Sequence, residues 1–194
     1  MQWLSNDFGG LLLGFELGNI AVNGGASLAD MEKAYICGGK APALMIVTSE
    51  HRHRAHNADR FCLKHHVPLL TSRRTADRLD TEGIETLTLA VPGTRFLFRM
   101  GVGLSLFPVR YDSAEPFGMT FLDGETLLGI VPDGKILPGQ AGDLFDCDAV
   151  ILGNRLHIPG NAPSALERRL KSVYNTRDEL DEIFRNYTGD ITYI

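Results

Sequence analysis

A continuous apolar run, Ala43 to Val47, does most to constrain the fold of this 194-residue chain. A strand with apolar residues at every position is typical of a sheet that is covered on both faces. Leu28, Met31 and Tyr35 stand at helical spacing before this run, and a second helical segment begins at Ala58 after it. The first half of the chain is therefore predicted to contain a βαβ-like unit.

A hairpin is expected before this unit and a series of strands after it. Leu11–Phe15 and residues 20–22 flank Gly18-Asn19, a pair typical of a two-residue hairpin turn. From residue 84 onward the pattern predicts an antiparallel meander with turns that contain glycine or proline. The expected meander strands are 85–91, 95–100, 104–109, 117–122 and 126–131, followed by a buried strand at 149–152 and amphipathic helices at 165–171 and 177–187.

Length and composition limit the domain organisation and the classes of partner. With 44% hydrophobic and 22% charged residues the chain is an ordinary globular one, and at ~100–200 residues per domain it is expected to form one domain, residues 1–194. Two sheets, packed together and covered by helices, fit this pattern. The net charge of −5 argues against a duplex-binding protein, so nucleic acid could be met only through a local basic patch.

The sequence also predicts the compartment. No window reaches the ~18 apolar residues of a membrane span, and the first residues lack the basic region of a signal peptide. The three cysteines show no C-x-x-C spacing, which favours a reducing environment. We therefore expect a cytoplasmic protein with no membrane contact.

Three of the six histidines, His51, His53 and His56, directly follow the buried strand. At i and i+2 the first two side chains can point the same way, and the third can return to the same centre. Three neutral imidazoles could then converge on one metal ion. The alternative is a solvated, partly charged turn that is rich in histidine, and the cluster alone leaves both interpretations open.

The stretch VTSEHRHRAH, residues 47–56, resembles the H-x-H-x-D-H signature of the metallo-β-lactamase superfamily, with Ala55 in the position of the aspartate. The resemblance extends over nearly the whole chain, from Phe8 to about Arg185. It is strongest to the branch of cyclic phosphodiesterases and nuclease-like hydrolases. It implies an α/β fold, an αββα four-layer sandwich in a single domain.

Other segments are similar to further parts of the same family pattern. Asn23 stands where the family has an aspartate that supports the metal cluster, and Tyr111 stands where the branch places a metal-binding histidine. Asp133 matches the aspartate that bridges two metals. The last histidine ligand of the family falls in the stretch 173–176, which has no histidine, although His157 could substitute in principle.

These departures limit the metal content that the resemblance implies. The first metal site keeps His51, His53 and Asp133, while the second keeps only His56 and the shared Asp133. Three protein ligands with one open position can lower the pKa of a bound water, but two ligands are too few. We expect at most one divalent ion, zinc or manganese, or no metal, with Tyr111 or Asp112 as a further oxygen donor.

Two functions remain open at this stage. The chain is either a mononuclear metal-dependent hydrolase of a phosphodiester or small ester, or a catalytically inactive binding or scaffold protein that has lost its dinuclear site. In the first case Arg52 and Arg54, within the basic stretch 50–80, would steer a small anionic substrate. In the second case the acidic stretch 111–148 would suit a protein partner. The oligomeric state and the substrate do not follow from the sequence.

Overall fold

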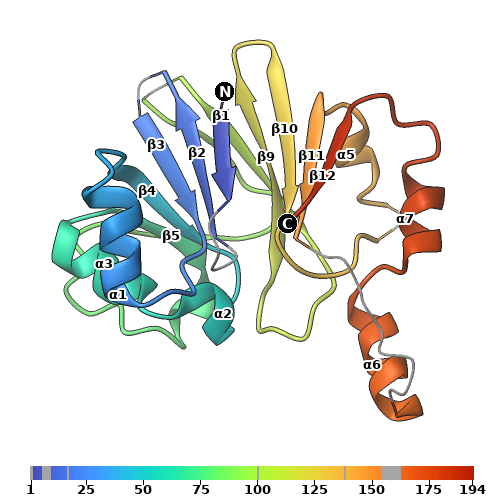
Figure 1. The fold of residues 1–194 in the computed structure, drawn as a ribbon, viewed down its shortest axis with the longest axis horizontal. Helices are drawn as coiled ribbons and strands as arrows, with labels where there is room; N and C mark the ends of the chain where they lie inside the picture. Colours follow the sequence, from blue (N-terminus) through green and yellow to red (C-terminus); the bar gives the residue numbers. More distant parts are fainter. Residues whose placement is uncertain (1, 6–9, 17, 100, 138, 154–162) are drawn as a thin grey trace. The chain divides into compact units, whose positions relative to one another are not determined.

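The computed structural model describes residues 2–5, 10–16, 18–99, 101–137, 139–153 and 163–194 (Figure 1). The chain divides into two compact units, called here the N-terminal unit (Met1–Val91 and Ser113–Glu115) and the C-terminal unit (Pro92–Asp112 and Pro116–Ile194). Each unit contains a six-stranded sheet and helices, so the predicted α/β class is confirmed. The expectation of a single domain over residues 1–194 is not tested by this division and stays a prediction.

The sheet of the N-terminal unit has its strands in sequence order, β1-β2-β3-β4-β5-β6. The first three strands are antiparallel, and the last four, beginning with β3, run parallel. Parallel neighbours need crossover connections, which helices supply here. The strands are β1 (Gln2–Ser5), β2 (Leu11–Phe15), β3 (Gly18–Val22), β4 (Pro42–Val47), β5 (Leu69–Ser72) and β6 (Leu87–Ala90).

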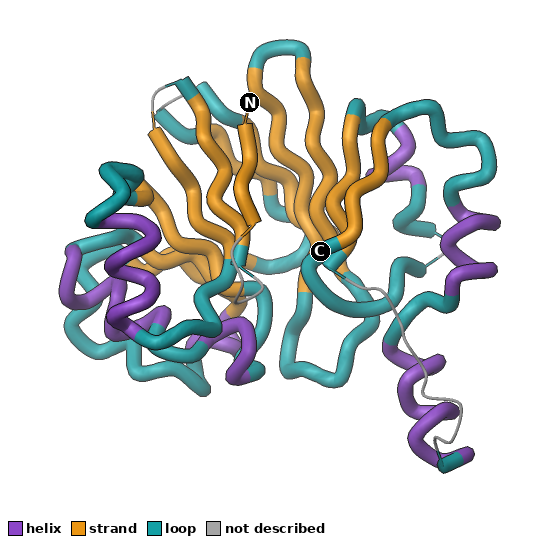
Figure 2. The backbone as a smooth tube through the Cα atoms, in the orientation of Figure 1, coloured by secondary structure: helices purple, strands orange, loops and turns teal. Residues whose placement is uncertain are grey.

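Helices cover one face of this sheet (Figure 2). Ser27 begins the first helix, because its hydroxyl accepts a hydrogen bond from the backbone N–H of Asp30 at 3.2 Å. Tyr35 and Phe61 from the helices pack with Met45 and Leu69 from the strands in one apolar cluster. The helices are α1 (Leu28–Met31) with its π-helical continuation η1 (Glu32–Ile36), α2 (Arg52–Ala55), α3 (Ala58–His65) and α4 (Arg73–Ala76).

The sheet of the C-terminal unit has the order β12-β11-β10-β9-β8-β7. Strands β7 to β10 form the antiparallel meander, and β11 and β12 are parallel to β10. Leu144, Leu180 and Phe184 pack with Val131 and Val150 on one face of this sheet. The elements are β7 (Arg95–Leu97), β8 (Gly103–Pro108), β9 (Phe117–Asp123), β10 (Thr126–Val131), α5 (Gly142–Phe145), β11 (Ala149–Leu152), α6 (Ser164–Val173), α7 (Arg177–Ile183) and β12 (Asp190–Tyr193).

Two sequence expectations about strands were wrong. Gly18-Asn19 is not the hairpin turn, because the register that sets Ile20 opposite Leu13 also pairs Gly18 with Phe15. Residues 85–91 do not open the meander: β6 runs parallel to β5, after the crossover that contains α4, and so belongs to the N-terminal unit. None of the described helices is long and apolar enough to cross a membrane.

Candidate functional site

The predicted metal ligands come from both units, and each set is described within its own unit. His51, His53 and His56 belong to the N-terminal unit, and Asp133 belongs to the C-terminal unit.

Asn23 fixes the loop from which the histidines project. Its φ of 62° is left-handed, a conformation that asparagine tolerates better than most residues. Its backbone N–H donates to Ile46 O at 2.7 Å. Its side-chain oxygen accepts hydrogen bonds from the backbone N–H and the hydroxyl of Thr48, both at 3.0 Å. The buried amide thus ties the end of β3 to the end of β4, directly before the histidine stretch.

His51 and His53 lie close together at the start of α2. His51 is the N-cap of this helix, and its carbonyl accepts from the N–H groups of Arg54 and Ala55. The two rings are 5.7 Å apart between centres and inclined by 17°, and the Nε2 atom of His51 is buried. Two imidazoles bound to one zinc ion at about 2 Å have ring centres within about 6 Å of each other. The separation of the two ring centres therefore matches that of two imidazoles on one ion.

The position of the family aspartate is occupied by a core residue. Ala55 is 4% exposed and belongs to the apolar cluster that contains Ala58 and Phe61. His56 follows it as the C-cap of α2 and lines a cleft of about 250 Å³ on the N-terminal unit. A methyl group in the core supplies no ligand, so this part of the chain does not fit a second ion.

The two arginines predicted to steer an anion differ in exposure. Arg52 is exposed and lines the same cleft as His56. Arg54 is 6% exposed, and its backbone carbonyl accepts from Gly24 N–H at 2.7 Å. Burial removes Arg54 from the surface that an approaching anion meets, whereas Arg52 remains there.

In the C-terminal unit a tight turn carries Asp133 beside Tyr111. The turn follows β10 and includes Gly134, whose φ of 102° favours glycine. Arg110 and Lys135 form a backbone bridge with N–H to O distances of 3.0 and 2.7 Å. Asp133 is 6% exposed.

The Tyr111 hydroxyl accepts a hydrogen bond from the hydroxyl of Tyr174 at 3.0 Å. Burial, the nearby Asp133 carboxylate and this hydrogen bond together raise the pKa of Tyr111 well above its usual range. The phenol therefore stays protonated at neutral pH. Tyr111 lacks the imidazole nitrogen of the histidine that it replaces, and its expected role as an oxygen donor to a metal stays a prediction.

Asp112 is engaged by an arginine. Its carboxylate forms an ion pair of 2.5 Å with Arg169 of α6. Two residues before α7, the buried Asn175 side chain accepts from Ile136 N–H at 2.7 Å and donates to Ile136 O at 3.4 Å. Helix α6 is therefore bound to Asp112, the neighbour of Tyr111, and the connection between α6 and α7 is bound to Ile136, three residues after Asp133.

Among the described residues, no group of three or more His, Cys, Asp or Glu side chains is arranged to hold a metal ion. His157 lies outside these residues, and its proposed substitution for the last ligand stays a prediction, as does the set of His51, His53 and Asp133.

Several polar contacts near the histidines had no signal in the sequence. Both carboxylate oxygens of Glu50 accept from Ala114 N–H, at 2.9 and 3.2 Å. The buried hydroxyls of Ser49 and Ser113 have no hydrogen-bond partner in the described part of the chain. Tyr174 could have been found, because it lies in the stretch where the last histidine was sought.

No protein-family model and no curated protein matches the sequence, but solved structures do. The metallo-β-lactamase fold protein YhfI from Bacillus subtilis matches with 11% identity and a TM-score of 0.66, covering 95% of this chain and 88% of that one. A diphosphatase from the PhnP family matches with 14% identity and a TM-score of 0.70, covering 95% of this chain and 71% of that one. Igni18, a metallo hydrolase from the archaeon Ignicoccus hospitalis, matches with 12% identity and a TM-score of 0.58, covering 96% of this chain and 91% of that one. The chain has the metallo-β-lactamase fold.

Proposed function

We propose that this chain is a metal-dependent hydrolase that uses one divalent ion, zinc or manganese, and acts on a phosphodiester or another small ester. The observation that carries the proposal is the closeness of the imidazoles of His51 and His53, whose ring centres lie 5.7 Å apart at the N-terminus of α2. Asp133, the retained family residue, is the third ligand in this proposal. Two structural neighbours support the reaction class, since one is a diphosphatase and another a metallo hydrolase.

The chain's own residues orient the proposed ligands and place a phenol beside one of them. Asn23 and Thr48 hold the loop before His51 through two hydrogen bonds of 3.0 Å. Tyr111 is a hydrogen-bonding group beside Asp133, and burial together with that carboxylate raises its pKa and favours the protonated phenol. An ion bound there would supply Lewis-acid polarisation of the ester and activation of water.

The test compares hydrolysis of bis-(p-nitrophenyl) phosphate and p-nitrophenyl acetate with zinc, with manganese and after chelation. We expect His51→Ala and His53→Ala each to lower kcat/KM by more than about 100-fold, above the effect of residues that only orient ligands. His66→Asn is the matched control, because it removes an exposed imidazole at a left-handed position of the same unit. Equal losses in all three variants would contradict the proposal.

A second candidate is a binding or scaffold protein without hydrolytic activity. The observation that favours it is the replacement of ligands by the Tyr111–Tyr174 pair and by the buried Ala55. A wild-type protein that binds neither zinc nor manganese and hydrolyses neither ester would establish this candidate over the first.

A further inference from the structure

We propose that the cleft beside His56 on the N-terminal unit is a binding site for a phosphate group. It has a volume of about 250 Å³ and is open to solvent on the surface of one unit. Its polar wall comes from the loop after β4, from α2 and from the first turn of α3: Glu50, Arg52, His56, Asn57, Asp59 and Arg60.

The two carboxylates in this wall are committed to backbone donors. Glu50 accepts from Ala114 N–H with both oxygens, at 2.9 and 3.2 Å. Asp59 accepts from its neighbour Arg60 N–H at 2.7 Å and from Asp80 N–H at 3.1 Å. Fixed backbone N–H groups stabilise both negative charges, so neither carboxylate needs a guanidinium partner.

The two arginines in the wall are uncommitted. Within the described part of the chain, the guanidinium groups of Arg52 and Arg60 form no ion pair and no hydrogen bond, and the His56 ring forms none either. Asn57, by contrast, is held in place, since its side chain donates to Ala26 O at 3.0 Å. The cleft therefore presents two unused fork-shaped donors on a fixed wall, and planar forks of N–H groups suit phosphate oxygens.

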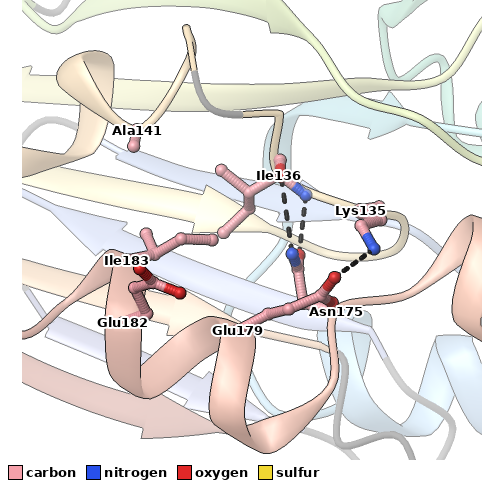
Figure 3. Close-up of a pocket in the computed structure, with 7 residues that line it drawn as sticks. All are labelled: Lys135, Ile136, Ala141, Asn175, Glu179, Glu182 and Ile183. Carbon is pink, nitrogen blue, oxygen red and sulfur yellow. Dashed lines mark hydrogen bonds and ion pairs between the residues drawn. The ribbon is translucent and has the colours of Figure 1, made fainter.

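The larger cavity of the C-terminal unit shows the contrast (Figure 3). Its volume is about 430 Å³, and its one cation, among the residues that line it, is Lys135. The Lys135 ammonium is already bound to Glu179 at 2.6 Å and to Lys171 O at 3.1 Å. A charge satisfied in this way has little left for a ligand, whereas the donors of Arg52 and Arg60 are available.

This inference rests in part on the proposed function, because it assigns the substrate a phosphate group that lies beside the histidines. The shared chemistry is an anionic phosphate group, whether free or carried by an ester. Binding itself requires neither a metal ion nor hydrolysis, so it can be measured separately from activity.

In the experiment, chelator-treated protein at low ionic strength is titrated with inorganic phosphate and, separately, with phenyl phosphate. Calorimetry measures the binding in each titration. We expect Arg60→Gln to weaken binding by about tenfold, the loss of one charge-assisted hydrogen bond, and Arg60→Lys to weaken it less. Arg73→Gln is the control, because Arg73 is an exposed arginine of α4 outside the cleft. It should change the dissociation constant by less than about twofold, as expected of an exposed, screened charge.

Equal weakening by Arg60→Gln and Arg73→Gln would reduce the effect to general charge attraction and overturn the proposal, as would no binding at millimolar phosphate. Binding of both probes assigns the cleft to phosphate esters, and binding of inorganic phosphate alone assigns it to the free ion. If Arg60→Gln lowers the thermal stability, Arg52→Gln tests the same cleft. Retained phosphate binding in His51→Ala, together with absent hydrolysis in wild type, would leave this site standing while the proposed function fails.

Discussion

The hydroxyl of Tyr174 lies 3.0 Å from the hydroxyl of Tyr111, and the two ring centres are 5.4 Å apart. Tyr111 follows β8 in the chain and Tyr174 follows α6. Family resemblance leads one to expect a histidine at the first position and another within 173–176. A direct hydrogen bond between two phenols thus joins two segments that each carry a metal ligand in the family pattern.

The hydrogen bond between these tyrosines should contribute measurably to stability. Tyr111→Phe and Tyr174→Phe are each expected to lower the free energy of unfolding by about 1 kcal/mol, because each removes one partner of a half-buried pair. Their double mutant should cost less than the sum, with a coupling energy of about 0.5–1.5 kcal/mol. Urea unfolding of the four proteins measures this energy, and strictly additive losses would show that the two hydroxyls do not interact.

The metal stoichiometry should be at most one ion per chain. The proposed ion uses His51 and His53, while Ala55 in the core supplies no ligand for a second ion. Elemental analysis after dialysis against zinc or manganese measures the ratio. Two tightly bound ions would contradict the ligand assignment and would require a role for Tyr111, Asp112 or His157.

Restoring two family residues should strengthen metal binding. Ala55→Asp with Tyr111→His is expected to raise zinc affinity more than ~10-fold, the scale on which even supporting residues act. Because Ala55 lies in the apolar cluster, the metal-free variant should lose about 1–3 kcal/mol of stability by burying a polar group. Competition with a zinc indicator measures the affinity, and Ala55→Asn with Tyr111→His is the uncharged control. An unchanged affinity would mean that these loops are not aligned as the resemblance implies.

Chelation should change the thermal stability little. Both sheets have continuous apolar clusters of their own, and a metal that binds only the folded state adds RT ln(1 + [L]/Kd), which is small when binding is weak. We expect EDTA to move Tm by no more than a few degrees, since ~1 kcal/mol corresponds to ~2–4 °C in a domain of this size. A decrease of ten degrees or more in calorimetry would instead reveal a tightly held ion.

The ion pair between Lys135 and Glu179 should make stability depend on pH in the acid range. Burial alone would raise the pKa of Glu179, but hydrogen bonds from Lys135 and Thr176 outweigh it and lower the pKa below 4.5. A lowered carboxyl pKa gives stability that is present above that ordinary value and is lost as the pH falls through the folded-state value. Glu179→Gln should therefore lower the free energy of unfolding by well under 1 kcal/mol at neutral pH, because the pair is partly exposed. It should also make that free energy depend less on pH in the acid range. Urea unfolding at several acid pH values measures this pH dependence, and the same dependence in the variant and the wild type would contradict the prediction.

The local pattern of apolar residues was enough to predict the strands and helices whose buried positions recur at a regular spacing. The run at Ala43–Val47 is β4, and the helical spacing after Ala58 is α3. This pattern did not predict which sheet a strand joins, because strand pairing between distant segments decides that. Residues 87–90 have a strand-like pattern that suits either sheet, and only their pairing with β5 places them in the N-terminal unit. Edge strand β12 was missed, because its four residues are partly exposed and follow a helix without a strong apolar run.

For the candidate site, the sequence located the residues but not their contacts. It marked Tyr111 as a replaced ligand and Asn23 as a support, and the structure gives each a hydrogen-bond partner, Tyr174 and Thr48. Those partners lie 63 and 25 residues away, and no spacing rule connects positions so far apart. The exposure of Arg52 beside the burial of Arg54 likewise depends on how α2 packs.

Residues 113–115 lie between β8 and β9 in the chain but belong to the N-terminal unit. There Ala114 N–H satisfies Glu50, and the Glu115 carboxylate accepts from Arg74 N–H at 3.3 Å. Synthesis on the ribosome therefore exposes the whole N-terminal sheet before the residues that complete its polar contacts exist. The last polar contacts of that unit can therefore form only after β7 and β8 of the C-terminal unit have been synthesised.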